Sequence, residues 1–140
     1  MSEANKRTIR FVREQAMRRG MLDKLDGLYT DDYVYHGIPM LGDLRGPTAF
    51  KELARGFIDA VSEFQETVED QIAEGDKVAT RISGRGKHTG TLMGAAPTGE
   101  VLKWSAIGIT RFVNGRIAEE WVEFDGLSLL QLLGVVPHMT

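Results

Sequence analysis

A chain of 140 residues has the length of one domain, and we expect a single domain over residues 1–140. Hydrophobic residues make up 42% and charged residues 26% of the sequence, proportions that exclude an intrinsically disordered chain. The net charge of −3 argues against a nucleic acid or an anionic membrane as partner, and the absence of cysteine excludes disulfides and thiol nucleophiles.

Helical periodicity marks the first half of the chain. Ile9, Val12 and Ala16 recur at helical spacing and predict a helix over residues 3–19, followed by a short helix over residues 21–28. We assign the charged side chains of the first helix to its solvent-exposed face; they are Arg10, Arg13, Glu14 and Arg18. A third helix is expected to begin at Pro47, because proline favours the first helical position, and to continue to about residue 61.

Strand signals dominate the remainder. Aromatic and β-branched side chains predict an extended segment over residues 31–37. Further elements are four strands over residues 65–73, 77–89, 101–113 and 116–124, and a closing helix over residues 127–133. The pair Asn114-Gly115 predicts a tight hairpin turn between the last two strands. Helices followed by antiparallel strands are typical of an α+β domain, and a curved sheet around a long helix leaves a concave site for a small molecule.

Several segments, taken in chain order, resemble the motifs of one known family. They are YVYH at residues 33–36, VEDQIAEGDKV at 68–78, GKHTG at 86–90 with GAAPTG at 94–99, and GRIAEEW at 115–121 with FD at 124–125. Together they resemble the SnoaL-like polyketide cyclases and the related ester cyclases of the nuclear transport factor 2-like superfamily. The resemblance implies a cystatin-like α+β cone, with N-terminal helices packed on a curved antiparallel sheet around one pocket. It also implies a homo-oligomer, usually a dimer through the outer sheet face, and an enzyme without a cofactor.

Asp125 is the main catalytic candidate, because the resemblance implies that the aspartate after the tryptophan motif is the general acid/base. A carboxylate against apolar walls can remove a proton from a carbon flanked by carbonyl groups, as an aldol-type ring closure requires. The residues also allow another interpretation, in which Asp125 caps the closing helix. By strand alternation Asp125 shares a face with Trp121 and Glu123, so an inward Asp125 would bring Glu123 inward as well.

His36 is the second catalytic candidate. Alternation groups it with Val34, and we expect both to point into the cone, where a protonated histidine would stabilise an oxyanion. The alternative is a hydrogen-bonded core histidine. The expected substrate-binding residues are Tyr33, Tyr35, Phe57, His88, Trp104 and Trp121. For His88 the alternative is a loop-pinning role, and for the two tryptophans it is core packing or a dimer interface.

Two strand positions bear on the pocket and on the oligomer. Gly108 stands where the family often has a polar residue, and the closing helix has Leu132 where a glutamine is expected, so we expect a pocket poor in polar groups. Ile107 and Ile109 lie opposite Ala106 on their strand, and apolar side chains on both faces indicate that a second subunit covers the outer face.

No metal is expected, because His36, His88 and His138 lack metal-ligand spacing. The N-terminus has no signal-peptide pattern, and no apolar run approaches the ~18 residues of a membrane span, so we expect a cytoplasmic protein. The leading hypothesis is a cofactor-free enzyme that acts on a hydrophobic polycyclic carbonyl compound. The alternatives are a non-catalytic small-molecule-binding domain, or a diverged epoxide hydrolase, isomerase or cofactor-independent hydroxylase. Arg81, on the solvated face of its strand, gives epoxide hydrolysis little support.

Overall fold

Three helical segments, a six-stranded sheet and two further helices make up the fold, and the computed structural model describes residues 2–37 and 42–137. The helical elements are α1 (Ser2–Arg10), η1 (Phe11–Ala16), η2 (Leu22–Leu25), α2 (Pro47–Ala60) and α3 (Gly126–Leu132). The strands are β1 (Tyr29–His36), β2 (Leu44–Arg45), β3 (Val61–Glu74), β4 (Lys77–His88), β5 (Val101–Val113) and β6 (Arg116–Phe124). The expected α+β class is confirmed.

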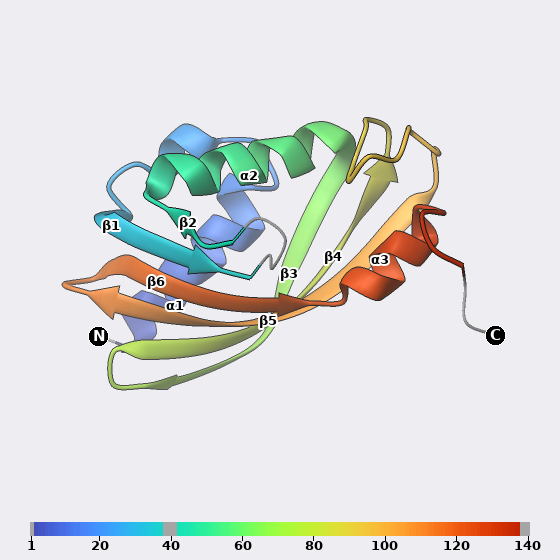
Figure 1. Cartoon of the computed structure of the whole chain (residues 1–140). Coiled ribbons are helices and arrows are strands. Elements are labelled where there is room, and N and C mark those ends of the chain that lie inside the picture. Colours follow the sequence, from blue (N-terminus) through green and yellow to red (C-terminus); the bar gives the residue numbers. More distant parts are fainter. Residues whose placement is uncertain (1, 38–41, 138–140) are drawn as a thin grey trace.

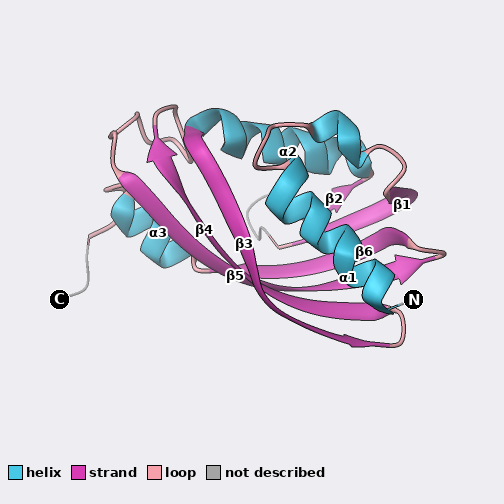
Figure 2. Cartoon of the chain, turned by 180° about the vertical axis from the view of Figure 1, so that it is seen from behind, coloured by secondary structure: helices cyan, strands magenta, loops and turns pink. Residues whose placement is uncertain are grey.

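The strands form one curved sheet in the order β2-β1-β6-β5-β4-β3. Helix α2 crosses the concave side of this sheet, and α3 follows β6 at one end of it (Figure 1). Seen from behind, α1 leads up to the same concave side (Figure 2). All neighbouring strands are antiparallel except β1 and β6, which are parallel, so the expectation of a purely antiparallel sheet needs this correction. The parallel pair arises because β1 enters the sheet from the helical half of the chain, far from β6 in sequence.

The first predicted helix changes type in its middle. Helix α1 ends at Arg10, and η1 continues it as a π-helix, in which the amide of Met17 donates to the carbonyl of Val12, five residues earlier. This wider turn shifts the phase of the side chains relative to a regular helix. Arg13 consequently points inward, with only 13% of its side chain exposed, and its expected place on the solvent-exposed face is wrong. The short helix expected over residues 21–28 is a single 3-10 turn, η2.

The later elements lie close to their predicted positions. Helix α2 begins at Pro47 as expected, and β5 and β6 have the predicted bounds. Asn114 and Gly115 both have positive φ, at 51° and 79°, as a tight hairpin turn between twisted strands requires. Strand β3 begins earlier than predicted, at Val61 instead of residue 65, because residues 61–64 pair with the end of β4 through an irregularity at Glu63.

Strand β3 is bent by two irregularities in its pairing with β4, one between Ser62 and Gln65 and one between Val68 and Asp70. Between them Phe64, Glu66 and Val68 are buried on the concave face. The core under α2 is aromatic: the Tyr33 ring meets the rings of Tyr29 and Phe50 edge-on. No helix of the described residues is long and apolar enough to cross a membrane.

Candidate active site

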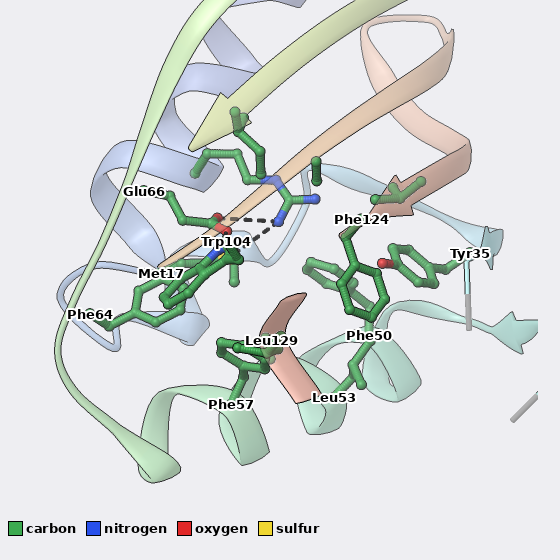
Figure 3. Close-up of a pocket in the computed structure, with 15 residues that line it drawn as sticks. Met17, Tyr35, Phe50, Leu53, Phe57, Phe64, Glu66, Trp104, Phe124 and Leu129 are labelled. Carbon is green, nitrogen blue, oxygen red and sulfur yellow. Dashed lines mark hydrogen bonds and ion pairs between the residues drawn. The ribbon is translucent and has the colours of Figure 1, made fainter. Parts of the chain in front are cut away.

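A cavity of about 120 Å³ lies between α2, η1 and the concave face of the sheet. Figure 3 shows Phe57, Phe64 and Trp104 on one side of it and Tyr35, Phe50 and Phe124 on the other. The remaining apolar lining consists of Met17, Leu53, Ala54, Ile82, Ala106, Val122 and Leu129. The volume is close to the roughly 150 Å³ of an engineered apolar cavity that accepts benzene. The enclosed space therefore fits about one aromatic ring.

The cavity has one polar wall, formed by Arg13 and Glu66 with the indole of Trp104. The Nη1 of Arg13 donates to Glu66 Oε1 at 3.3 Å, and Trp104 Nε1 donates to Glu66 Oε2 at 2.9 Å. The Glu66 side chain is 5% exposed. Each of its two oxygens accepts a hydrogen bond, so burial leaves neither oxygen without a partner.

Gly84 permits the contact between Trp104 and Glu66. In the register of the sheet, Gly84 of β4 lies directly between Glu66 of β3 and Trp104 of β5. A Cβ at residue 84 would overlap the Trp104 ring, so only glycine leaves the indole room to lie across β4. The hydrogen bond between Trp104 and Glu66 therefore requires glycine at residue 84.

A second carboxylate, that of Glu120, is buried near Arg13 but does not line the cavity. Glu120 of β6 is buried, and it accepts hydrogen bonds from the Tyr33 hydroxyl at 2.7 Å and from the Thr110 hydroxyl at 3.1 Å. Burial by itself lowers the pKa of Arg13, but the carboxylates of Glu66 and Glu120 raise it above its usual value, so the guanidinium stays charged. Arg13 thus lines a mostly apolar cavity as a cation, in direct contact with Glu66.

Tyr35 supplies the remaining polar group of the cavity lining. Burial raises the pKa of its hydroxyl; Arg13 opposes this shift, and Glu120 and Glu66 add to it. Burial and then Glu120 also raise the pKa of Tyr33, whose hydroxyl is committed to that carboxylate. Tyr35 is therefore a neutral hydrogen-bond donor to a ligand in the cavity.

Asp125 lies outside the cavity lining, and its contacts match the capping alternative. It is the exposed N-cap of α3, where Oδ1 accepts a hydrogen bond from the Ser128 amide at 3.1 Å. Hydrogen bonds from Ser128 hold the pKa of Asp125 below its usual value. The physical reason is strand parity: from Ala118 to Phe124 the burial of β6 alternates, which leaves Glu123 and Asp125 on the outer side. Its catalytic role stays a prediction.

His36 also lies on the outer face, so its predicted inward orientation is wrong. In β1 the buried positions are Tyr33 and Tyr35, and alternation sends Val34 and His36 outward. The ring of His36 stacks on exposed Trp121 with centroids 5.4 Å apart, and its two nitrogens contact Asp43 and Glu119 at 2.8 and 2.7 Å. Neither His36 nor Trp121 touches the cavity.

The other predicted binding residues divide into three groups. Tyr35, Phe57 and Trp104 line the cavity. Tyr33 is fully buried behind it, bound to Glu120. His88 is fully buried and pins the loop before β5, because its Nδ1 accepts from the Thr98 amide at 3.2 Å and contacts the Thr98 hydroxyl at 3.0 Å. The loop-pinning alternative for His88 thus matches its contacts.

Sequence reasoning missed three charged residues: Arg13, Glu66 and Glu120. A signal existed for the two glutamates, since Glu66 alternates with Phe64 and Val68, and Glu120 with Ala118 and Val122. These charged residues come from η1, β3 and β6. Arg13 and Glu66 lie among mostly apolar lining residues, so the expectation of a pocket poor in polar groups is confirmed. Within the described residues no cluster of three or more His, Asp or Glu side chains could hold a metal ion, and His138 lies outside those residues.

The α+β cone, with helices over the concave face of one curved sheet and a cavity between them, is a fold shared with solved structures: that of TsrD from Streptomyces laurentii matches with a TM-score of 0.85 and 24% identity, covering 96% of this chain and 97% of that one. The family model described as SnoaL-like polyketide cyclase matches residues 6–133. The chain belongs to this family, which confirms the resemblance seen in the sequence motifs.

Two similar proteins are named as methyl ester cyclases. Aklanonic acid methyl ester cyclase AcmA from Streptomyces galilaeus is 30% identical over 115 residues, covering 80% of this chain and 80% of that protein. Nogalonic acid methyl ester cyclase from Streptomyces nogalater is 29% identical over 114 residues, covering 79% of this chain and 85% of that protein. The crystal structure of AclR from Streptomyces galilaeus, for which a hydroxylase activity has been suggested, matches with a TM-score of 0.85 and 28% identity, covering 100% of this chain and 86% of that one.

Proposed function

We propose that this chain is a ring-closing enzyme that acts, without a cofactor, on a hydrophobic polycyclic carbonyl compound bound in the cavity under α2. The observation that carries the proposal is the composition of the cavity: its lining is mostly aromatic and aliphatic, with one charged wall formed by Arg13 and Glu66. Apolar walls suit fused aromatic rings, and a few convergent polar groups suit carbonyl oxygens. The family and its named relatives support the reaction class.

The proposed reaction is an intramolecular aldol addition. A base removes a proton from a carbon flanked by carbonyl groups, and the resulting enolate carbon attacks a second carbonyl of the same molecule. The new alkoxide then takes up a proton, so the product has the mass of the substrate. Arg13 and the Tyr35 hydroxyl are the groups of the cavity that would stabilise the enolate oxygen.

The reacting ring, and not the whole substrate, would occupy the enclosed space, because about 120 Å³ fits roughly one ring. Phe124 and Leu129 line the cavity on either side of Asp125 in the sequence. A shift of α3 would therefore widen the cavity and also release Asp125 from its capping bond with Ser128. This shift is what the predicted acid/base role of Asp125 requires.

The test uses the two methyl esters for which the relatives are named, aklanonic acid methyl ester and nogalonic acid methyl ester. Each is incubated with the protein and analysed by liquid chromatography with mass detection. Ring closure gives a new species of unchanged mass and altered absorbance. Absence of any such species with both esters contradicts the proposal.

The Asp125→Asn variant tests the catalytic residue that the family resemblance predicts. Loss of turnover with unchanged folding supports the role, and undiminished turnover removes Asp125 from the mechanism. A rise in melting temperature with both esters but no turnover by the wild type indicates the non-catalytic binding domain instead.

Epoxide opening by water is a second candidate, and one observation favours it: the buried guanidinium of Arg13 lies against Glu66, with Glu120 near enough to raise its pKa. An arginine between carboxylates can hold both a water and an epoxide oxygen. The predicted argument against this activity relied on Arg81, which is exposed. When the protein is incubated with an epoxide, a product heavier than the substrate by the mass of one water would distinguish this reaction from ring closure and from hydroxylation.

We also propose that the protein is a homodimer through the outer sheet face. Ile107, Ile109 and Trp121 are 56%, 43% and 38% exposed there, and contiguous exposed apolar side chains of this kind are typical of a contact surface. The partner would cover the residues around β5 and β6.

A further inference from the structure

We infer that Glu66 is the group that removes and returns the proton in the cavity, in place of Asp125. The inference deepens the proposed function and rests on it for the reaction class. It starts from the inner surface of the cavity, where three titratable side chains occur among the described lining residues: Arg13, Tyr35 and Glu66. A base has to be one of these, because the reacting carbon must come within hydrogen-bond reach of it.

Two of the three cannot accept a proton near neutral pH. The pKa of Arg13 is raised, although burial opposes the effect of Glu66 and Glu120, so its guanidinium keeps its proton. The pKa of Tyr35 is raised by burial, so its hydroxyl is neutral and has no anionic form to offer. Glu66 is the one carboxylate in the described lining of this cavity.

The geometry holds the Glu66 carboxylate for such a transfer. Its two oxygens are each bound by one donor, Arg13 at 3.3 Å and Trp104 at 2.9 Å, so each oxygen has a lone pair left for a further proton. The Trp104 ring packs against Phe57 and Phe64, with centroids 5.2 and 5.4 Å away. A planar ligand ring beside this cluster would place its acidic carbon next to a carboxylate whose orientation is already fixed.

The step balances within the substrate and one side chain. The carboxylate takes a proton from the carbon next to the carbonyl, the C–H electron pair becomes the enolate, and Arg13 and Tyr35 donate hydrogen bonds to the enolate oxygen. The enolate carbon then forms the new C–C bond with the carbon of the second carbonyl group. The oxygen of that second carbonyl becomes an alkoxide and takes the proton back from Glu66. No oxidant or further reactant is needed.

The decisive experiment measures proton removal without ring closure. The probe is β-tetralone, a bicyclic aromatic ketone with an acidic CH₂ between its ring and its carbonyl, which has no second carbonyl to attack. Wild-type protein in D₂O is expected to accelerate deuterium incorporation at this CH₂, followed by NMR. Glu66→Gln keeps the size and one acceptor oxygen but cannot take the proton, and it is expected to lower the protein-dependent rate by about 10²-fold or more.

The matched control is Glu69→Gln, the same substitution on the same strand at an exposed position outside this cavity, which should leave the exchange rate unchanged. Quenching of tryptophan fluorescence by β-tetralone reports binding, and the dissociation constant of Glu66→Gln should stay within about threefold of the wild type if the defect is chemical. If Glu66→Gln does not fold, the double variant Glu66→Gln with Arg13→Met replaces it, because it removes both charges of the pair. Its exchange rate is then compared with that of Glu66→Asp, a variant that retains both Arg13 and a carboxylate.

Each outcome decides the inference. Exchange that depends on Glu66, with binding retained, supports it even if neither methyl ester is converted, a result that would contradict only the proposed ring closure. Exchange by Glu66→Gln within about threefold of the wild-type rate overturns the inference, as does wild-type protein that does not accelerate exchange at all. Conversion of the esters by Glu66→Gln at the wild-type rate overturns it while leaving the ring-closure proposal intact.

Discussion

Arg13 and Glu66 stabilise each other at the polar wall of the cavity. The Glu66 side chain is 5% exposed and the Arg13 side chain 13% exposed, so water compensates poorly for the loss of either partner. Removing one member of a buried ion pair typically costs about 3–5 kcal/mol, because the other charge is left unpaired. The pair therefore shapes the ligand site and also the stability of the domain.

Arg13→Met should lower the free energy of unfolding by about 3–5 kcal/mol, measured by chemical denaturation. Adding Glu66→Gln should recover part of this loss, since no uncompensated charge then remains. Arg10→Met, at an exposed position one helical turn earlier, is the control and should change stability by less than about 0.5 kcal/mol. Equal losses at the two arginines would contradict the inward placement of Arg13.

His36 is expected to titrate above the ordinary range of a histidine. Its hydrogen bond to Glu119, followed by that to Asp43, raises its pKa, against a smaller opposing effect of burial. A folded-state pKa above the unfolded value of about 6.5 means that this cluster stabilises the fold fully below pH ~6.5 and loses the contribution as the pH rises through the folded value. NMR titration should show the raised pKa in the wild type and a lower pKa in Glu119→Gln. An unchanged midpoint in that variant would contradict the prediction.

At this scale the sequence predicted aromatic contacts better than charged ones. Tyr35, Phe57 and Trp104 were found because a large apolar side chain in a strand or helix is usually buried somewhere in the interior. His36 was misplaced because alternation does not say which face of a strand is inward, and that choice depends on the neighbouring strands. For Asp125 both the parity shared with Glu123 and the capping alternative could be read from the sequence.

Among the elements, β4 has the most specific packing requirement. Gly84 lies under the indole of Trp104, and a methyl group at residue 84 would push that ring away from Glu66. The position has no positive φ, so its requirement for glycine is one of space and not of backbone conformation.

Gly84→Ala should destabilise the fold by about 1–3 kcal/mol through overpacking and should shift the tryptophan emission, since Trp104 loses its hydrogen bond to Glu66. The control is Gly56→Ala, in the exposed face of α2, where an added Cβ meets nothing within 4 Å. That variant should gain about 0.5–1 kcal/mol from helix propensity and leave the emission unchanged. Both effects are measured by denaturation followed by fluorescence. A stable Gly84→Ala protein with unaltered emission would argue against the packing described.

Element bounds were predictable where turn chemistry marks them. Pro47 marks the start of α2, and Asn114-Gly115 marks the turn between β5 and β6. The π-helical turn of η1 had no such marker, because its residues have the composition of an ordinary amphipathic helix. The inward position of Arg13, which depends on this π-helical turn, was therefore not predicted either.

For the whole molecule, the outer sheet face is the feature that a single chain leaves unexplained. We expect the wild-type protein to sediment as a dimer. Ile107→Glu combined with Ile109→Glu should convert it to a monomer, because two charges would be buried without partners in the contact. Leu127→Glu, at a 53% exposed residue of α3 and not of β5 or β6, is the control and should remain a dimer. A wild-type monomer, or a dimer that survives both isoleucine substitutions, would contradict this contact surface.

The overall architecture was the most predictable level. Helical periodicity in the first half of the chain and strand alternation in the second predicted the α+β class. Motifs spread from residue 33 to residue 125 indicated the cone and its family. The parallel pairing of β1 with β6 was missed, because the two strands are separated by most of the chain and no turn connects them. Long-range pairing depends on how the layers close, and local patterns carry little of that information.

The π-helical turn between Val12 and Met17 also bears on how such a cavity could change in evolution. A π-turn contains one residue more than an α-turn, so it corresponds to a one-codon insertion in a regular helix. Deletion of a single codon there would restore regular winding and rotate every earlier side chain by about 100° relative to those that follow. Arg13 would turn away from the cavity in one genetic event and leave Glu66 without its partner, so the polar wall would change while the lining residues of the sheet stayed the same. Selectivity for a different ligand could thus arise without any substitution in the sheet.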